Sequence, residues 1–360
     1  MITISLCMIV KNEEKVLNRC LNSIKDIVDE IIIIDTGSTD KTKKIAKSYT
    51  KYVYDFKWED DFSKARNFSF SKATKDYIMW LDADDVVLDN DRKKILKLKS
   101  TLDTSTDIVM FKYNTGFDEN DNVNFSYYRE RLLKRSNNYK WVSPIHEVII
   151  PNGKIMYSDI AITHKKQKQK DMKRNLNIFE NMIKKGTKLD ARQEFYYARE
   201  LYYNSKFNEA ITVFNNFLEN PTGWIENKID ACILLSKCYQ EIDNKDLSFL
   251  SLFKSFIYDT PRAETCCELG NLFLKYNNYY MSIYWYEFAT NLPINMENGG
   301  FCSIDSYKYI PYIQLCVCYF KIGDYEKSKK YNKLAGKEKP YSKSYLSNKI
   351  LFENLEKINN

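Results

Sequence analysis

Hydrophobic and polar positions follow two different periods along the chain, and the change falls near residue 168. In residues 1–168, short apolar runs rich in Ile and Val alternate with segments in which apolar positions return every three or four residues. The apolar runs predict strands at residues 2–10, 28–35, 51–56 and 76–84. The segments between them, such as 14–26, predict helices. This alternation predicts an α/β fold with a mostly parallel sheet, which binds ligands at the carboxyl ends of its strands.

Residues 169–360 have helical periodicity throughout, and their pattern repeats. Small residues recur twelve positions apart, in the pairs Ala198 and Ala210, Ser236 and Ser248, Gly270 and Ser282, and Cys316 and Ser328. A proline follows each unit: Pro221, Pro261, Pro293 and Pro340. This pattern resembles the tetratricopeptide repeat, with small residues where two helices cross; an irregular helical bundle is the alternative. The wider spacing of the last two units predicts an insertion at 295–306.

Two domains are therefore expected, at 1–168 and 169–360. A composition of 44% hydrophobic and 29% charged residues is typical of a globular protein. We expect no membrane span, because no apolar run approaches the roughly 20 residues that a spanning helix needs. The first apolar run has no basic segment before it, which argues against a signal peptide. Nine cysteines without a C-x-x-C pair favour free thiols in a reducing compartment, so a cytoplasmic location is expected.

The charge balance gives no reason to expect a nucleic-acid partner. The chain has 55 Lys and Arg against 48 Asp and Glu, a net charge of +7. Its densest basic run, residues 164–174, is interpreted as a linker and helix start rather than a phosphate-binding surface. No zinc-finger, RNA-recognition or helix-turn-helix signature accompanies this run.

Four carboxylates lie in the last residues of the predicted strand at 76–84 or just after it: Asp82, Asp84, Asp85 and Asp89. Acids at the end of a buried strand are costly unless a cation meets them. Asp85 and Asp89 have the alternative interpretation of helix caps. Asp82 and Asp84 suit a hard divalent cation that also binds phosphate oxygens. The chain has no G-x-G-x-x-G after its first strand and no Walker sequence, so a bound diphosphate would need that cation.

The segments SLCMIVKNEE, VDEIIIIDTGSTD, DFSKARN and YIMWLDADD resemble, in order and spacing, the nucleotide-sugar half of family 2 glycosyltransferases with the GT-A fold. The resemblance implies that Asp35 binds uracil, that Asp82 contacts the ribose or the metal, and that Asp84 binds the metal. Thr36 stands where many members have a second aspartate, which weakens the assignment of the base. The resemblance implies a nucleotide-sugar site made by Lys11, Glu13, Asp35, Arg66 and Asp82.

The two histidines of the chain, His146 and His164, fall late in the first domain. The segment RERLLKRSNNYKWVSPIHE resembles an R-L…W-x-x-x-x-H-E segment of a bacterial subgroup of these transferases. Inverting transfer needs a base for the acceptor proton. We assign that role to Glu147, with His146 positioning the acceptor or the diphosphate; the reverse assignment stays open. His164 is expected to complete the metal shell, and its imidazole favours Mn²⁺ over Mg²⁺; the alternative is a histidine without function.

The resemblance implies an enzyme: a metal-dependent, inverting hexosyltransferase that uses a UDP-sugar and Mn²⁺ or Mg²⁺. The repeats would form a concave surface for a peptide or protein, so Cys, Ser or Thr side chains are the expected acceptors. This arrangement resembles peptide S-glycosyltransferases of the sublancin type, and it allows a homodimer. Two alternatives remain: a saccharide acceptor in cell-surface glycan synthesis, and a repeat scaffold without catalysis.

Overall fold

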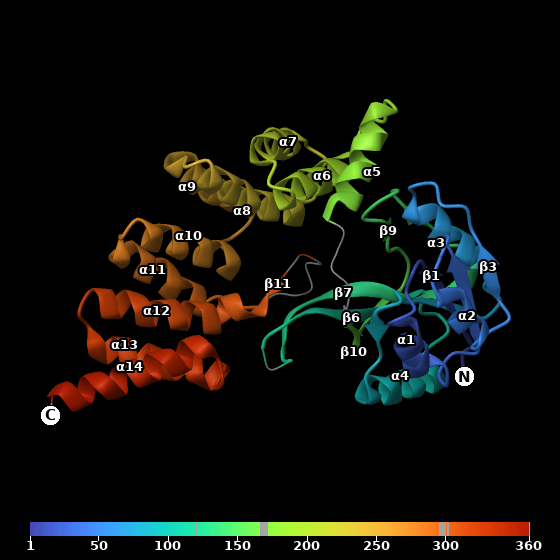
Figure 1. The fold of residues 1–360 in the computed structure, drawn as a ribbon, viewed down its shortest axis with the longest axis horizontal. Helices are drawn as coiled ribbons and strands as arrows, with labels where there is room; N and C mark the ends of the chain where they lie inside the picture. The colour runs from blue at the N-terminus through green and yellow to red at the C-terminus, as the bar shows by residue number, and fades with distance from the viewer. Residues whose placement is uncertain (120, 166–171, 295–299, 301, 360) are drawn as a thin grey trace. The chain divides into compact units, whose positions relative to one another are not determined.

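The computed structural model describes residues 1–119, 121–165, 172–294, 300 and 302–359. The chain divides into two compact units (Figure 1). The first unit comprises Met1–Thr115 and Ser126–Lys188, and the second comprises Gly116–Phe125 and Leu189–Asn360. The expected domain boundary between 168 and 169 lies outside the described residues.

The first unit is built on a sheet, as the sequence predicts. Its strands are β1 (Ile4–Val10), β2 (Glu30–Asp35), β3 (Val53–Asp55), β4 (Tyr77–Trp80), β5 (Asp85–Val86), β6 (Ile108–Phe117), β7 (Val123–Lys134), β8 (Trp141–Val142), β9 (Val148–Ile149) and β10 (Ile155–His164), where β6 and β7 continue into the second unit. The main sheet has the order β3-β2-β1-β4-β7-β6-β10-β5, and β8 pairs with β9 separately. Strands β3, β2, β1 and β4 are parallel, whereas β7 runs antiparallel to β4. The predicted α/β class is confirmed.

Helices cover both faces of this sheet, and the alternation of side chains along the strands explains why. The helices of the unit are α1 (Leu17–Ile24), α2 (Thr42–Lys47), α3 (Phe62–Ser71), α4 (Asp89–Thr101) and α5 (Met172–Lys184), with a 3-10 turn at Arg135–Asn137. Ile31 and Ile33 of β2 enter one core cluster, together with residues of α1, α2 and α4. Ile32 and Ile34 enter a second cluster with Phe70 of α3. Successive residues of a strand point to opposite faces, so both faces of β2 are buried.

Polar residues gather where the parallel strands end. Strands β1, β2 and β4 run in the same direction, so the residues that follow each of them lie at one edge of the sheet. These are the segments that begin at Lys11, Asp35 and Leu81. The topology therefore brings three segments far apart in the sequence to the place where the sequence predicts a ligand site.

The second unit is helical (Figure 1). Its elements are α6 (Ala191–Tyr203), α7 (Phe207–Glu219), α8 (Ile225–Glu241), α9 (Lys245–Lys254), α10 (Ala263–Lys275), α11 (Tyr279–Thr290), α12 (Tyr309–Lys321), α13 (Tyr325–Glu338) and α14 (Lys343–Asn359), with a short strand β11 (Cys302–Ser303) and 3-10 turns at Ser255–Ile257 and Ile304–Tyr307. Helices α6 and α7, α8 and α9, α10 and α11, and α12 and α13 pack as pairs. The predicted tetratricopeptide-like repeats are confirmed.

All eight of the recurring small residues are buried, and two of the four pairs join their helices directly. Ser282 Oγ donates to the Gly270 carbonyl at 2.7 Å, and Ser328 Oγ donates to the Cys316 carbonyl at 2.6 Å. A Cβ atom at Gly270 would lie 2.8 Å from the ring of Tyr286. The helices approach so closely that a larger residue at this position would collide with its neighbour.

Other sequence predictions have mixed outcomes. All nine cysteines are free and buried, as predicted. In the predicted insertion, residues 295–299 and 301 lie outside the described residues; 302–307 form β11 and a 3-10 turn. Of the basic run, residues 166–171 also lie outside them, and α5 begins at Met172. Within the described part of the chain, no helix has the length and hydropathy needed to cross a bilayer.

Candidate functional site

A cavity of about 480 Å³ opens within the first unit, at the carboxyl edge of β1, β2 and β4. Seven of the residues predicted from the sequence line it: Lys11, Glu13, Arg66, Asp82, Asp84, His146 and Glu147. Asp35 and His164 are not among the lining residues. Asp35 directly precedes the lining residue Thr36, and His164 contacts Asp84. The structure thus brings together seven of the nine predicted residues and keeps the other two adjacent.

Arg66 joins two carboxylates of the cavity. Its Nη2 donates to Asp82 Oδ1 at 2.7 Å, and its Nε donates to Glu147 Oε1 at 2.6 Å. Its guanidinium carbon lies 5.1 Å from the ring centroid of Trp80 and 4.8 Å from that of Trp141. Burial alone would lower the pKa of Arg66, but the two carboxylates raise it above its usual value. A charged guanidinium packed against two indole rings therefore fixes where the carboxyl groups of Asp82 and Glu147 lie.

The charge of Asp82 is stabilised by its neighbours. Burial alone would raise the pKa of Asp82, but the guanidinium groups of Arg66 and Arg131 lower it to about 2. Asp82 is consequently ionised at neutral pH. Its Oδ1 already accepts a hydrogen bond from Arg66, so the guanidinium of Arg66 serves as the counter-charge of Asp82.

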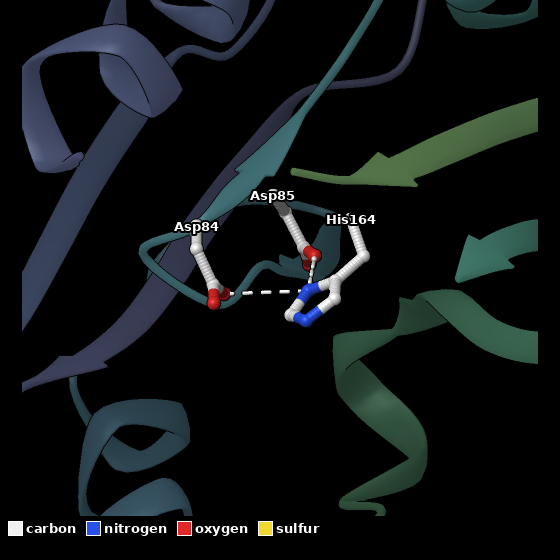
Figure 2. Close-up of side chains that lie close together, drawn as sticks. All are labelled: Asp84, Asp85 and His164. Atoms are coloured by element: carbon white, nitrogen blue, oxygen red, sulfur yellow. Dashed lines mark hydrogen bonds and ion pairs between the residues drawn. The ribbon is translucent and has the colours of Figure 1, made fainter. Parts of the chain in front are cut away.

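Asp84, Asp85 and His164 form a group that could hold a metal ion, with ligand atoms within 4.8 Å of one another (Figure 2). His164 Nδ1 lies 3.4 Å from Asp84 Oδ1 and 3.4 Å from Asp85 Oδ1. Burial and the neighbouring acids raise the pKa of Asp84, although His164 opposes the shift. Burial alone would lower the pKa of His164, but the hydrogen bond to Asp85 and the charges of the three acids raise it. Two carboxylates and an imidazole fit a divalent cation by their chemistry. The predicted ligand Asp82 is not in this group.

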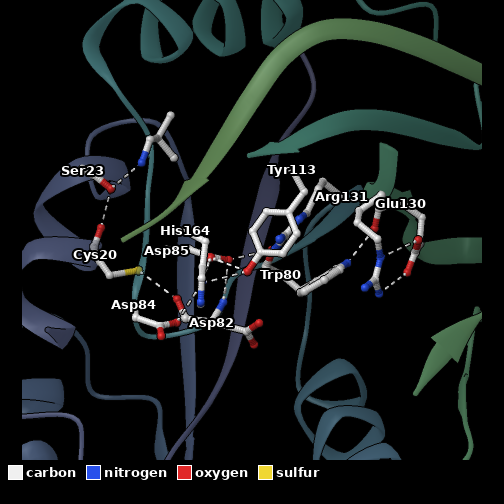
Figure 3. Close-up of polar contacts among 12 residues, drawn as sticks. Cys20, Ser23, Trp80, Asp82, Asp84, Asp85, Tyr113, Glu130, Arg131 and His164 are labelled. Carbon is white, nitrogen blue, oxygen red and sulfur yellow. Dashed lines mark hydrogen bonds and ion pairs between the residues drawn. The ribbon is translucent and has the colours of Figure 1, made fainter. Parts of the chain in front are cut away.

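The helix-cap interpretation of Asp85 is wrong, because the residue lies in β5 and is completely buried, and because the N-cap position of α4 is Leu88. Its Oδ2 accepts from Arg131 Nη1 at 3.1 Å and its Oδ1 accepts from the Tyr113 hydroxyl at 2.9 Å (Figure 3). Helix α4 begins after Leu88, and the side chain of Asp89 is 98% exposed in its first turn. Asp85 is thus a buried member of the candidate metal group, and both of its carboxylate oxygens already accept hydrogen bonds.

Asp35, at the end of β2, retains an unused acceptor. Its Oδ1 accepts from the backbone amides of Gly37 and Ser38, both at 2.9 Å. Its Oδ2 is buried and has no hydrogen-bond partner among the residues that the structure describes. A buried carboxylate oxygen without a partner is costly, and a ligand that donates a hydrogen bond would remove that cost. This fits the predicted contact with a nucleobase.

His146 has an unusual backbone conformation. Its φ is 51°, in the left-handed region that most side chains avoid. Its ring stacks on Phe179 of α5, with centroids 6.2 Å apart and an interplanar angle of 21°. Such strain at a cavity wall is typical of functional sites, where surrounding contacts hold it in place.

Some residues of the site were not identified from the sequence. Arg129 of β7 lines the cavity, and its guanidinium carbon lies 4.9 Å from the ring centroid of Trp80. Tyr113 also lines the cavity, and both Tyr113 and Arg131 contact Asp85. The segment RERLLKR does contain both arginines, and strand alternation would have placed them on one face. Nothing in the sequence pairs them with the acids that follow β4.

Comparisons with known proteins show which chains are similar in sequence and fold. Residues 5–162 match the family model described as Glycosyl transferase family 2, so these residues are a domain of that family. The SPbeta prophage-derived glycosyltransferase SunS of Bacillus subtilis is 31% identical over 250 residues, which cover 65% of this chain and 58% of SunS. A TPR repeat-containing protein of Synechococcus elongatus is 37% identical over 150 residues, covering 41% of this chain and 36% of that protein.

Among solved structures, that of MamA is similar with a TM-score of 0.37 and 16% identity, covering 47% of this chain and 90% of MamA. A TM-score at this level supports no inference about ligand or activity. The chain spans little more than half of SunS and about a third of the Synechococcus protein.

Proposed function

We propose that the protein is a metal-dependent, inverting glycosyltransferase that moves a hexose from a UDP-sugar to a Cys, Ser or Thr side chain of a peptide or protein. The observation that carries this proposal is the set of groups around one cavity: an unused buried acceptor on Asp35, the carboxylates joined by Arg66, and the group of Asp84, Asp85 and His164. Residues 5–162, which match the Glycosyl transferase family 2 model, include all of these residues except His164.

The nucleotide would lie along the carboxyl edge of the sheet. Asp35 Oδ2 would accept a hydrogen bond from the base, and Lys11 and Glu13 would line the path toward the diphosphate. Asp84 and His164 would hold Mn²⁺ or Mg²⁺, which neutralises the diphosphate and stabilises the departing UDP. Asp82, fixed by Arg66, would contact the ribose or the metal.

Glu147 would act as the base. Its carboxylate lies at the cavity wall, with a side chain only 12% exposed, and Arg66 restrains it. As the acceptor hydroxyl or thiol attacks the anomeric carbon, its proton passes to Glu147 and the bond from that carbon to the diphosphate breaks. UDP leaves with the bonding electrons, and the configuration inverts. His146 would position the acceptor or the diphosphate beside Glu147.

The helical unit would bind the acceptor. It contains its own cavity of about 550 Å³, lined mainly by residues of α8, α10 and α12, and also by Phe125, Arg262, Tyr286, Ser303 and Ser306. Concave surfaces of helical repeats suit extended peptides. The nine free, buried cysteines support a reducing compartment such as the cytoplasm.

Release of UDP tests the proposal. The full chain is incubated with UDP-glucose or UDP-N-acetylglucosamine, with Mn²⁺ or with a chelator, and UDP is measured. We expect release with Mn²⁺, none with the chelator, and loss of release in Asp84→Ala. Asp89→Ala is the matched control, because Asp89 is exposed and outside the cavity. Mass spectrometry of a cell lysate treated with donor then identifies the acceptor. A chain that binds UDP but never releases it from a sugar donor would be a scaffold, and sugar found only on glycans would contradict the peptide acceptor.

A further inference from the structure

One edge of the His164 ring faces three side-chain oxygen atoms. Its Nδ1 lies 3.0 Å from the Tyr113 hydroxyl oxygen and 3.4 Å from the Oδ1 atoms of both Asp84 and Asp85 (Figure 2 and Figure 3). Figure 2 shows the other nitrogen, Nε2, on the edge of the ring away from Asp85. The two ring nitrogens therefore have different surroundings, and only one of them faces the buried cluster.

The hydrogen-bonding groups around Nδ1 determine which ring nitrogen of His164 carries the proton. The Tyr113 hydroxyl has a single proton, which it donates to Asp85 Oδ1 at 2.9 Å. The tyrosine oxygen can then only accept from His164, and ionised carboxylates also only accept. All three neighbours of Nδ1 are acceptors, so Nδ1 carries the proton. In a neutral imidazole this leaves the lone pair on Nε2.

Asp85 is held as an acceptor by a buried guanidinium. Its Oδ2 accepts from Arg131 Nη1 at 3.1 Å and from the Asp82 amide at 3.0 Å, and both side chains of this ion pair are completely buried. The Arg131 guanidinium carbon lies 3.7 Å from the Trp80 centroid and 4.3 Å from that of Tyr113. Arg131 Nε and Nη2 have no hydrogen-bond partner in the described part of the chain.

Arg131 therefore depends on Asp85 for its counter-charge. A buried guanidinium without a carboxylate would be strongly destabilising. Both oxygens of Asp85 are already occupied, one by Tyr113 and the other by Arg131 and the Asp82 amide. A metal ion that took Asp85 as a ligand would have to break these bonds, whereas Asp84 and Nε2 of His164 remain available.

We propose that Asp85, Tyr113 and Arg131 are positioning residues that fix His164 as the Nδ1–H tautomer, so that Nε2 binds the divalent cation together with Asp84. Asp85, although it lies among the three candidate ligands, does not bind the ion. Hydrogen bonds of this kind orient metal-binding histidines and strengthen their binding of the metal. The inference rests on the proposed function only in taking His164 as a metal ligand.

The tautomer can be measured on the metal-free chain. The protein has two histidines, so ¹⁵N-histidine labelling gives two ring systems, and the one missing in His164→Asn belongs to His164. We expect long-range ¹H–¹⁵N spectra at a pH where the ring is neutral to show a protonated Nδ1 and an unprotonated Nε2. Addition of Cd²⁺, a diamagnetic probe ion, should shift Nε2. A protonated Nε2, or a Cd²⁺-induced shift at Nδ1, would overturn the proposal.

Tyr113→Phe tests the positioning residues. It keeps the ring against Arg131 and removes the hydroxyl between Asp85 and His164. Mn²⁺ affinity, measured by electron paramagnetic resonance of free Mn²⁺, should fall about 10–100-fold, the usual effect of losing such a partner. The histidine spectrum should show a weaker preference for Nδ1–H, because only the two carboxylate oxygens at 3.4 Å remain beside Nδ1. Tyr77→Phe is the matched control, because Tyr77 is also buried and donates one hydrogen bond, to the Thr106 carbonyl. It should change neither measurement.

The outcomes separate this inference from the proposed function. A folded Tyr113→Phe chain with the same tautomer and the same Mn²⁺ affinity would overturn the inference. If the unaltered chain binds no Mn²⁺, the metal dependence of the proposed function fails, whereas the tautomer of the metal-free chain still decides whether the cluster orients His164. Thermal unfolding of each variant shows whether a lost affinity reflects a lost fold.

Discussion

The two units each contain a cavity of similar size, about 480 and 550 Å³, but their charges differ. The cavity of the sheet unit is lined by four cationic residues, Lys11, Arg66, Arg129 and Arg174, and by four acids, Glu13, Asp82, Asp84 and Glu147. The cavity of the helical unit is lined by four acids, Glu226, Asp230, Glu264 and Glu268, and by two cationic residues, Lys237 and Arg262. One cavity is balanced, and the other has an excess of acid.

This difference in charge indicates which kind of ligand each cavity can bind. In the sheet unit, Arg66 is shared between two acids, and cation-binding groups lie beside cationic side chains, which suits a diphosphate with its metal. In the helical unit both cations are already paired, Arg262 with Glu226 and Lys237 with Glu268. Asp230 Oδ2 is buried without a hydrogen-bond partner among the described residues, although it lies 3.9 Å from Arg199 Nη1. This cavity is therefore suited to a cationic side chain.

The largest effect is expected for Glu147→Gln, which removes the base but keeps the hydrogen bond to Arg66. Transfer to a hydroxyl acceptor should fall about 10²–10⁴-fold, the contribution of a positioned base, while UDP and Mn²⁺ still bind. Single-turnover kinetics measure the rate of transfer, and calorimetry measures the binding of UDP with Mn²⁺. Transfer to a thiol should recover as pH rises toward about 8.5, where the thiol ionises without help. Full activity on both acceptors at neutral pH would make His146 the next candidate.

Arg131→Met should have the next largest effect, on stability. It leaves the buried Asp85 without a counter-charge, so unfolding should become easier by about 3–5 kcal/mol. Adding Asp85→Asn to the same chain removes the uncompensated charge and should restore part of this loss. Chemical denaturation of the single and double variants measures the coupling. Strictly additive losses would show that Arg131 and Asp85 do not depend on each other.

Asp35→Ala should weaken UDP binding by about 1–3 kcal/mol, the cost of losing a hydrogen bond in a buried site. Its metal dependence should not change, because the candidate metal group lies elsewhere in the unit. Asp55→Ala is a suitable control: Asp55 ends the neighbouring parallel strand, but its side chain is 73% exposed. Equal UDP affinities of the unaltered chain and Asp35→Ala in calorimetry would remove Asp35 from the site.

The smallest effect concerns the acidic cavity of the helical unit. A fluorescent Lys-Ser peptide should bind more tightly than a Glu-Ser peptide of equal length, and Asp230→Asn should reduce that preference by about 0.2–1 kcal/mol, as expected for a partly exposed charge pair. Asp246→Asn, exposed on α9, is the control. Fluorescence anisotropy measures both affinities. A preference for the Glu-Ser peptide would contradict the comparison of the two cavities.

The same experiment has a pH dependence with a definite sign. Burial raises the pKa of Asp230 and of Glu264 above their ordinary values. The cavity is therefore fully charged only above these raised pKa values, and it loses charge as pH falls through them. The preference for the Lys-Ser peptide should weaken with falling pH before ordinary surface carboxylates protonate. Affinity measured between neutral and acidic pH checks this order.

The sequence predicted those features that depend on local periodicity. Short apolar runs alternating with helical segments predicted the sheet, and small residues twelve positions apart predicted the paired helices, because each pattern can be recognised within a short stretch of sequence. The acids after β4 were identified because they interrupt an apolar run. These signals require no knowledge of which distant segments meet.

Contacts between distant segments could not be predicted in the same way. Arg66 and Glu147 are 81 residues apart, and Arg131 lies 46 residues from Asp85. In the sequence, Arg131 is one of three arginines in the segment RERLLKR, and Asp85 is one of four neighbouring acids. Because both side chains are buried, each needs the opposite charge of the other to remain folded. Their burial depends on the pairing of β4 with β7. The interpretation of Asp85 as a cap failed for this reason.

The left-handed backbone at His146 has a consequence for how this position tolerates substitution. A φ of 51° favours Gly, Asn and Asp over β-branched residues, whatever the reaction requires. In a saturation library, selection for soluble expression should therefore enrich those three residues at position 146. A second selection, for sugar transfer, would keep only those residues at position 146 that also support the reaction. The residues that pass the first selection and fail the second would define what the imidazole contributes, free of any contribution from backbone strain.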